Sequence, residues 1–273
     1  MLKIRVLVDN NTLVGKYFTG EPGFCLWIED GDYKVLFDLG YSGIFIDNAR
    51  EMGIDCDCVD ALVISHGHSD HTWGISRLLE HYNRSRVNRR PDFVAHPLAV
   101  ERKLLDGFEA GFAVRQEVLA KYFNLRLSSS PLRLTERLLW LGEIPASVQP
   151  RVPLGSMVVD GVESPDFCLD DSALVYEGVD GLVVISGCSH SGICNIVDYA
   201  VKLTGVTRIA DVIGGFHLQR VSDEKMNFIV DWFANNPPVC MHPCHCTDFY
   251  SKVAFARRFD VREVGVGDEF IFD

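Results

Sequence analysis

The chain has 273 residues, 47% of them hydrophobic and 23% charged, and its formal net charge is −12. This length suits one large domain or two small ones, with a sizeable buried core. The acidic balance disfavours a general nucleic-acid or anionic-membrane binder, although it allows a local basic pocket. No stretch approaches the ~20 apolar residues of a membrane span, so no membrane partner is expected.

The N-terminus and the cysteines indicate the compartment. Residues 1–8 alternate like a strand and lack the basic-then-apolar order of a signal peptide, which predicts a cytoplasmic protein. The nine cysteines are then free thiols or metal ligands rather than a disulfide framework. We expect most of them to be buried as small hydrophobic residues.

Hydrophobic periodicity predicts strands followed by helices in the first part of the chain. The expected elements are strands at 4–8, 24–28 and 33–37, a helix at 42–52, a strand at 61–64, a helix at 72–82 and a strand at 93–95. Glu29-Asp30-Gly31-Asp32 is a hairpin signal between the second and third strands. The continuous apolar run at 61–64 suits a strand that is buried on both faces.

The middle of the chain has weaker periodicity. Residues 98–127 are expected to be mostly helical or irregular, and residues 131–165 are short strands interrupted by five prolines. The expected elements that follow are strands at 172–177 and 182–186, a helix at 193–204, a strand at 208–213, a helix at 222–235, a strand at 239–241, a helix at 247–258 and a strand at 266–272.

Both halves of the chain mix hairpins with strand–helix units. This order predicts an α/β fold in which two mixed sheets pack together with helices outside, a four-layer αββα sandwich. We expect a single domain over residues 1–273, with an insertion at about 98–165.

The segment His66-Gly67-His68-Ser69-Asp70-His71 places four potential metal ligands within six residues. Such crowding is costly unless a cation binds, and divalent ions take neutral imidazole nitrogens and carboxylate oxygens. If the segment leaves a strand and turns into a helix, His66 and His68 point to one position, while Asp70 and His71 point to a neighbouring one. This spacing predicts two metal ions side by side, ~3.5–4 Å apart.

These residues resemble the HxHxDH signature of the metallo-β-lactamase superfamily, which is complete here. The resemblance implies the αββα fold. It also implies that Asp38, in Asp38-Leu39-Gly40, orients a ligand histidine from behind. Ser186-Gly187-Cys188 stands where the superfamily usually has Thr-Gly-Asp, whose aspartate bridges the two metals. A cysteine is known there in some members, so Cys188 is either a bridging ligand or a buried thiol.

The chain departs from the superfamily pattern at one ligand. A further histidine normally comes shortly before the strand at 172–177, but no histidine lies between His96 and His190. The nearby polar candidates are Cys168, Asp170 and Asp171. We expect His190, in the turn Gly-Cys-Ser-His-Ser-Gly, to replace the missing ligand.

Three later histidines have different expected roles. His245, in Pro-Cys-His-Cys-Thr-Asp, best matches the superfamily's last ligand, and His242 is the weaker candidate. His217, in Gly-Gly-Phe-His-Leu, is expected to be a general acid or a substrate contact rather than a ligand.

The combination GCSHSG, GGFHL and PCHCTD, with LVDNN near the start, resembles a narrower group. This group comprises metal-dependent hydrolases similar to the archaeal 7,8-dihydropterin-6-methyl-4-(β-D-ribofuranosyl)-aminobenzene-5′-phosphate synthase. The resemblance covers most of the chain and does not specify the substrate.

The leading prediction is a metal-dependent hydrolase that activates water against a phosphoryl or carbonyl centre, with Asp70 and His217 as catalytic residues. Two divalent ions are expected, zinc before manganese or iron. Their predicted ligands are His66, His68, Asp70, His71, His190 and His245, with Cys188 as a further candidate. One alternative is a synthase-type transferase that displaces diphosphate from a phosphorylated or pterin-like small molecule. Another is a non-enzymatic metal or ligand sensor, which would lack an open coordination position.

Overall fold

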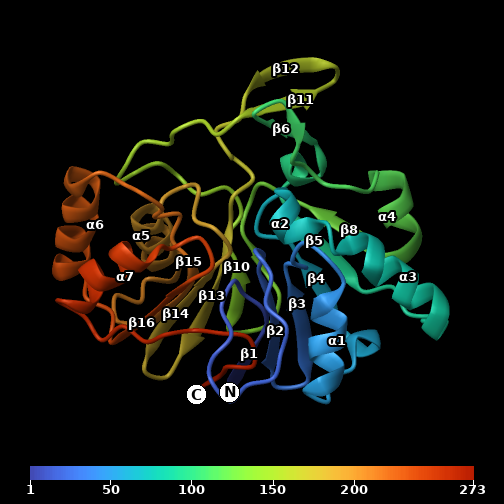
Figure 1. The fold of residues 1–273 in the computed structure, drawn as a ribbon, viewed down its shortest axis with the longest axis horizontal. Coiled ribbons are helices and arrows are strands. Elements are labelled where there is room, and N and C mark those ends of the chain that lie inside the picture. Colours follow the sequence, from blue (N-terminus) through green and yellow to red (C-terminus); the bar gives the residue numbers. More distant parts are fainter.

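Two β-sheets face each other in the middle of the molecule, and helices cover their outer faces (Figure 1). This computed structural model describes residues 1–273. Buried side chains of both sheets, such as Phe37 and Val63 from one and Tyr176 and Ile185 from the other, form one hydrophobic cluster between them. Two further hydrophobic clusters fill the outer layers: one lies between the first sheet and its helices, and the other between the second sheet and its helices. The predicted αββα sandwich is therefore confirmed.

The first sheet has seven strands in the order β17-β1-β2-β3-β4-β5-β8. The strands are β1 (Leu2–Val8), β2 (Cys25–Asp30), β3 (Tyr33–Phe37), β4 (Ala61–Val63), β5 (Asp92–Ala95), β8 (Asn124–Leu127) and β17 (Glu269–Phe272). Strands β3, β4, β5 and β8 are parallel, and the others pair antiparallel. The helical segments of this half are α1 (Ile44–Glu51), α2 (Ser69–Thr72), α3 (Ile75–Ser85), α4 (Gln116–Tyr122) and two short 3₁₀ turns (Cys56–Cys58 and Pro97–Val100).

The second sheet has six strands in the order β16-β15-β14-β13-β10-β9. The strands are β9 (Leu132–Arg133), β10 (Leu138–Trp140), β13 (Ala173–Gly178), β14 (Gly181–Ser186), β15 (Ile209–Gly215) and β16 (Cys240–Cys244). Its helices are α5 (Ile193–Thr204), α6 (Asp223–Asn235) and α7 (Phe249–Ala256). Strands β14, β15 and β16 are parallel, so the loops that follow them leave the sheet at one edge.

The segment 98–165 divides among three sheets. Its strand β8 joins the first sheet, and β9 and β10 join the second. Strands β6 (Arg102–Leu105), β7 (Phe108–Glu109), β11 (Ser156–Val159) and β12 (Val162–Pro165) form a separate four-stranded sheet that projects at the top of Figure 1. The single domain with an insertion stays a prediction, and this projecting sheet is the part of 98–165 that lies outside the two large sheets.

Several element boundaries differ from the sequence prediction, by three residues or fewer. The helix expected at 72–82 is two helices, α2 and α3, separated by Trp73-Gly74, and α2 begins inside the histidine motif. The last strand begins at Glu269 rather than 266, because Gly265–Asp268 form a turn. None of the helices combines the length and the apolar character that a membrane crossing needs.

A buried lysine ties the projecting sheet to the core. Lys103 on β6 is 1% exposed, and its ammonium group donates to Asp166 Oδ2 at 2.6 Å and Asp170 Oδ1 at 2.9 Å. Burial lowers the pKa of Lys103, but the two carboxylates outweigh burial and raise it above its ordinary value. Asp170 also accepts the backbone N–H of Gly67 at 2.8 Å, so this charge network reaches the histidine motif.

The same region packs directly on the motif. A Cβ atom at residue 67 would come within 2.2 Å of the Ala99 carbonyl oxygen, so only glycine fits between His66 and His68. The backbone N–H of Ser69 donates to Ala110 O at 2.9 Å. Residues 99–110 therefore hold the motif from behind.

Replacing Lys103 by methionine leaves two buried carboxylates without their counter-charge. Breaking a buried ion pair in this way typically costs about 3–5 kcal/mol. We expect Lys103→Met to lower the free energy of unfolding by that amount, measured by urea denaturation. The control is Lys202→Met, which removes an exposed pair with Asp198 on α5 and should cost no more than about 0.5 kcal/mol. Equal losses in the two variants would contradict the role given to Lys103.

Candidate metal centre

Loops from both sheets meet at one edge of the sandwich. The motif 66–71 follows β4, and residues 187–192, 216–217 and 245–246 follow β14, β15 and β16. Side chains from these loops are in direct contact: His68 Nδ1 lies 3.1 Å from His190 Nε2, and His71 Nε2 lies 3.1 Å from His245 Nε2. The carboxyl ends of parallel strands are a common place for functional sites.

The first group of side chains consists of His66, His68 and His190. Their ring centroids are 4.6–4.7 Å apart, and one nitrogen of each lies within 4.8 Å of the others. Burial and neighbouring positive charges lower the pKa of His66 and His190 well below the ordinary value. Burial lowers the pKa of His68 to about 4, because it outweighs the opposing effect of the nearby aspartates. His66 Nε2 is buried without a hydrogen-bond partner. Three neutral imidazoles therefore turn nitrogens towards one small region.

The second group consists of Asp70, His71 and His245. Asp70 Oδ2 lies 3.4 Å from His245 Nε2 and 3.8 Å from His71 Nε2. Burial raises the pKa of Asp70, but the neighbouring histidines outweigh burial and hold it well below its usual range. Burial lowers the pKa of His71, yet Asp70 and Asp38 outweigh burial and raise it to about 9.

Asp38 connects the two groups from behind. Its carboxylate accepts the backbone N–H and the hydroxyl of Ser65, each at 2.7 Å, and contacts His71 Nδ1 at 2.7 Å. The Ser65 hydroxyl also lies 3.0 Å from His66 Nδ1. Asp38 thus orients His71 directly and His66 through Ser65, as partners behind metal-binding histidines commonly do.

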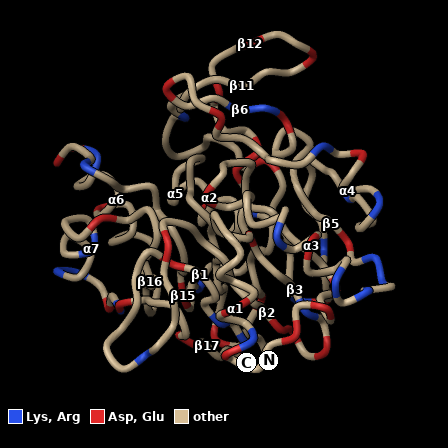
Figure 2. The backbone as a smooth tube through the Cα atoms, turned by 45° about the vertical axis from the view of Figure 1, so that its right-hand side comes forward, with Lys and Arg blue, Asp and Glu red and all other residues tan.

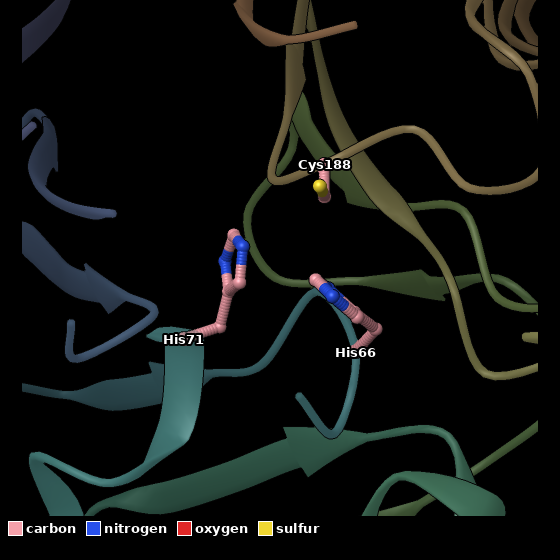
Figure 3. Close-up of side chains that lie close together, drawn as sticks. All are labelled: His66, His71 and Cys188. Atoms are coloured by element: carbon pink, nitrogen blue, oxygen red, sulfur yellow. The ribbon is translucent and has the colours of Figure 1, made fainter. Parts of the chain in front are cut away.

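Cys188 lies between the two groups. Its sulfur, a nitrogen of His66 and a nitrogen of His71 are all within 4.8 Å of one another, and Figure 3 shows the three side chains turned towards a common space. Cys188 also forms a second such group with His190 and His217. The thiol of Cys188 therefore lies beside members of both groups.

His217 borders the site and a cavity beside it. Its ring centroid is 4.2 Å from that of His190, and its Nδ1 is 3.6 Å from Cys188 Sγ. The cavity has a volume of about 180 Å³ and is lined by both histidines, by Gln149 and Lys225, and by apolar side chains of 150–154 and α6. His217 is thus placed to contact a molecule held in the cavity.

The remaining candidates have other roles. His242 contacts Asp211 at 2.9 Å and packs on Phe270. Asp170 holds the motif through Gly67, and Asp171 accepts the backbone N–H of Ser191 at 2.8 Å. The two aspartates therefore fasten the loops that carry the first group.

Sequence reasoning missed three side chains near His245. Asp9 accepts the backbone N–H of His245 at 2.9 Å, and Asn10 Oδ1 lies 3.0 Å from His245 Nδ1. The sulfur of Cys246 lies 3.0 Å from that of Cys188. Asp9 and Asn10 follow β1 directly and belong to the LVDNN motif, so their position at a strand end and this motif are the signals that point to them.

The residues present suit divalent metal ions. Five buried or half-buried histidines, one carboxylate and one thiol converge, and one histidine nitrogen has no partner in the protein. Imidazole, carboxylate and thiolate are the ligands that zinc takes in proteins. A metal ion bound at His66 Nε2 would give this buried nitrogen the partner that it lacks in the protein.

The metal-free protein should lose stability as the pH falls from about 6.5 towards 4. The folded-state pKa values of His66, His68 and His190 lie below the unfolded value of 6.5, so the unfolded chain binds protons first in this window. His71 acts in the opposite sense, because its contribution is present below 6.5 and is lost as the pH rises through about 9. Urea midpoints measured across the window test the expectation. His68→Gln should make the dependence of the unfolding free energy on pH shallower by about one proton. An unchanged pH dependence would contradict the lowered pKa given to His68.

Known proteins resemble the chain along most of its length. A family model of the metallo-β-lactamase superfamily matches residues 18–199. An uncharacterized protein of Methanocaldococcus jannaschii is 32% identical over 265 residues, covering 96% of this chain and 98% of that protein. The 7,8-dihydropterin-6-methyl-4-(β-D-ribofuranosyl)-aminobenzene-5′-phosphate synthase of the same organism is 26% identical over 275 residues, covering 94% and 92%.

The chain also resembles solved structures over its whole length. The crystal structure of Tm1679, a metal-dependent hydrolase of the β-lactamase superfamily, has a TM-score of 0.86 and 29% identity and covers 100% of both chains. This likeness, the matching family model and the αββα sandwich agree with one another. The chain belongs to the metallo-β-lactamase superfamily, whose members are generally metal-dependent hydrolases.

Proposed function

We propose that the chain is a metal-dependent hydrolase with a centre for two divalent ions. His66, His68 and His190 would hold one ion, and Asp70, His71 and His245 the other. The observation that carries the proposal is the contact between these groups: the rings of His66 and His71 are 4.2 Å apart, with Cys188 beside both. Cys188 would bridge the ions. Zinc suits imidazole and thiolate ligands best.

Two bound ions would supply Lewis-acid polarisation of the substrate and a water of lowered pKa. The chain's own groups would do the rest. Asp70 keeps 35% of its side chain exposed, so it can accept a hydrogen bond from the attacking water. His217 stands on the cavity side and can give a proton to the leaving group.

The substrate is proposed to be a small molecule with an acidic group. The cavity beside His217 adjoins a second one of about 460 Å³, and Gln149 and Lys225 line both. Lys225 would contact a phosphate or carboxylate. Nucleic acid is not the proposed substrate, because basic and acidic residues are interspersed around the molecule (Figure 2) and the net charge is −12.

Metal analysis and hydrolysis test the function together. Purified protein should contain about two metal ions per chain and hydrolyse bis-p-nitrophenyl phosphate or an activated ester. Mutation of a residue that hydrogen-bonds to a metal ligand typically lowers metal affinity ~10–100-fold. His68→Ala removes a proposed ligand itself, so it should lower metal affinity by more than this and should lower the rate of hydrolysis as well. His81→Ala, in a half-exposed pair with Asp57, is the control that should change neither. Metal-free wild-type protein, or His68→Ala with full metal content, would refute the proposal.

A synthase activity is the second candidate. It is favoured by the 26% identity to the aminobenzene-phosphate synthase over 94% of the chain. In this reaction the same centre would bind the diphosphate of a pterin while an aromatic partner displaces it. Incubation with a dihydropterin diphosphate and the ribosyl aniline phosphate separates the two: a coupled product supports the synthase, and diphosphate release alone supports the hydrolase.

His217→Gln should lower kcat by about 10²–10⁴ while leaving the metal content unchanged, because a general acid contributes about that much. The loss should be larger for an alkyl phosphodiester than for the p-nitrophenyl ester, whose leaving group needs no proton. His242→Gln is the matched control, since that histidine pairs with Asp211 instead of lining the cavity. Equal losses for the two leaving groups would rule out proton donation by His217.

A further inference from the structure

Three buried cysteines, Cys168, Cys188 and Cys246, lie outside the hydrophobic clusters, and two of them lie beside the histidines that follow the second sheet. Most of the buried cysteines, including Cys25 and Cys194, pack inside hydrophobic clusters. Cys188 and Cys246 are 4% and 5% exposed but belong to none of these clusters. They lie instead among the histidines of the candidate centre. Burial of a small hydrophobic residue does not explain their position.

We propose that Cys246 is a sulfur ligand of the metal centre, so that Cys188 and Cys246 supply it with two thiolates. The inference rests on the proposed two-ion centre and concerns a residue outside the superfamily signature. Binding would displace the thiol protons to solvent, with one metal–sulfur bond from Cys246 and no change in oxidation state.

The positions of the sulfurs suit a shared ion. The two Sγ atoms are 3.0 Å apart, and both lie within 4.8 Å of a ring nitrogen of His245. Zn–S bonds of ~2.3 Å and Zn–N bonds of ~2.0–2.1 Å allow ligands of one ion to be up to about 4.4–4.6 Å apart. The sulfur–sulfur distance is within this limit and His245 lies close to it, so Cys246 and Cys188 suit the ion of the second group. Water would then bind at the first ion, whose four protein ligands leave a fifth position.

The surrounding backbone is built to accept a sulfur at this place. The N–H of His217 donates to Cys246 Sγ at 3.2 Å, and hydrogen bonds to sulfur are a common way of stabilising a metal-bound thiolate. A Cβ atom at residue 215 would come within 2.5 Å of Cys246 Sγ, so Gly215 leaves the room that the sulfur occupies. His217 has a positive φ of 50°, which turns its N–H at the end of β15.

Two thiolates would change the properties of the centre. Two divalent ions carry four positive charges, and Asp70 with two thiolates carries three negative ones, so the centre would keep a single positive charge. Soft sulfur ligands favour zinc over manganese, which prefers oxygen. The inference thus narrows the metal identity that the histidines alone leave open.

Cobalt substitution tests the proposal, because thiolate ligands give Co²⁺ a charge-transfer absorption in the near ultraviolet. Metal-free protein is loaded with Co²⁺ under a phosphine reductant, and the absorption is measured per bound cobalt. If Cys188 bridges and Cys246 binds one ion, Cys246→Ala should lose roughly a third of the band and Cys188→Ala roughly two thirds, as three sulfur–metal bonds become two or one. The double variant should lose it all, and Cys194→Ala should keep it.

The outcomes separate the inference from the proposed function. A full band in Cys246→Ala overturns the inference and leaves the two-ion hydrolase standing, whereas wild-type protein that binds no cobalt overturns both. Thermal unfolding shows whether each variant is folded. Zinc X-ray absorption of the wild-type protein needs no variant: more than one sulfur per zinc on average, at ~2.3 Å, supports the inference, and one or fewer overturns it.

Discussion

The candidate centre depends on the buried carboxylate of Asp38. It accepts hydrogen bonds from the backbone and the hydroxyl of Ser65 and contacts Nδ1 of His71, all at 2.7 Å. A proton held on Nδ1 by this contact leaves Nε2 of His71 facing His245. The same carboxylate fixes Ser65, next to His66, at the end of β4. The Asp38 side chain, directly after β3, therefore orients residues in both groups. In the metal-free protein it also stabilises the protonated form of His71, and a divalent ion would have to displace that proton in order to bind.

The chain lacks the histidine that the superfamily normally carries shortly before β13. The segment that would carry it supplies two aspartates instead. Asp170 holds Gly67, between His66 and His68, and Asp171 holds Ser191, next to His190. These carboxylates accept hydrogen bonds from backbone N–H groups. A single short segment thus fixes both loops of the first group, which is consistent with the proposal that His190 takes the place of the missing ligand.

The predictable part of the structure was local in sequence. Six consecutive residues define the motif at 66–71, and alternation with turn signals locates β2, β3, β13 and β14. The burial of Lys103 could not be predicted, because the carboxylates that pair with it lie more than sixty residues away in the sequence. A charged residue at a buried position also breaks the hydrophobic alternation by which β6 could have been recognised. Cys246 was missed for the same reason, since its partner Cys188 is 58 residues away. His190 and His245 were found by resemblance and by their turns, and their assignment as ligands stays a proposal.

The candidate ligands and the wall of the neighbouring cavity lie on different parts of the chain. The ligand groups sit on loops of the two large sheets, whereas the cavity beside His217 is closed by residues 149–154. Asn195 on α5 holds this wall, accepting the N–H of Val148 at 2.7 Å and donating to the carbonyl of Gln149 at 2.9 Å. A Cβ atom at residue 192 would collide with Gln149, so the wall also packs tightly on the loop that carries His190. The 149–154 segment therefore shapes the cavity and also supports the loop that carries His190.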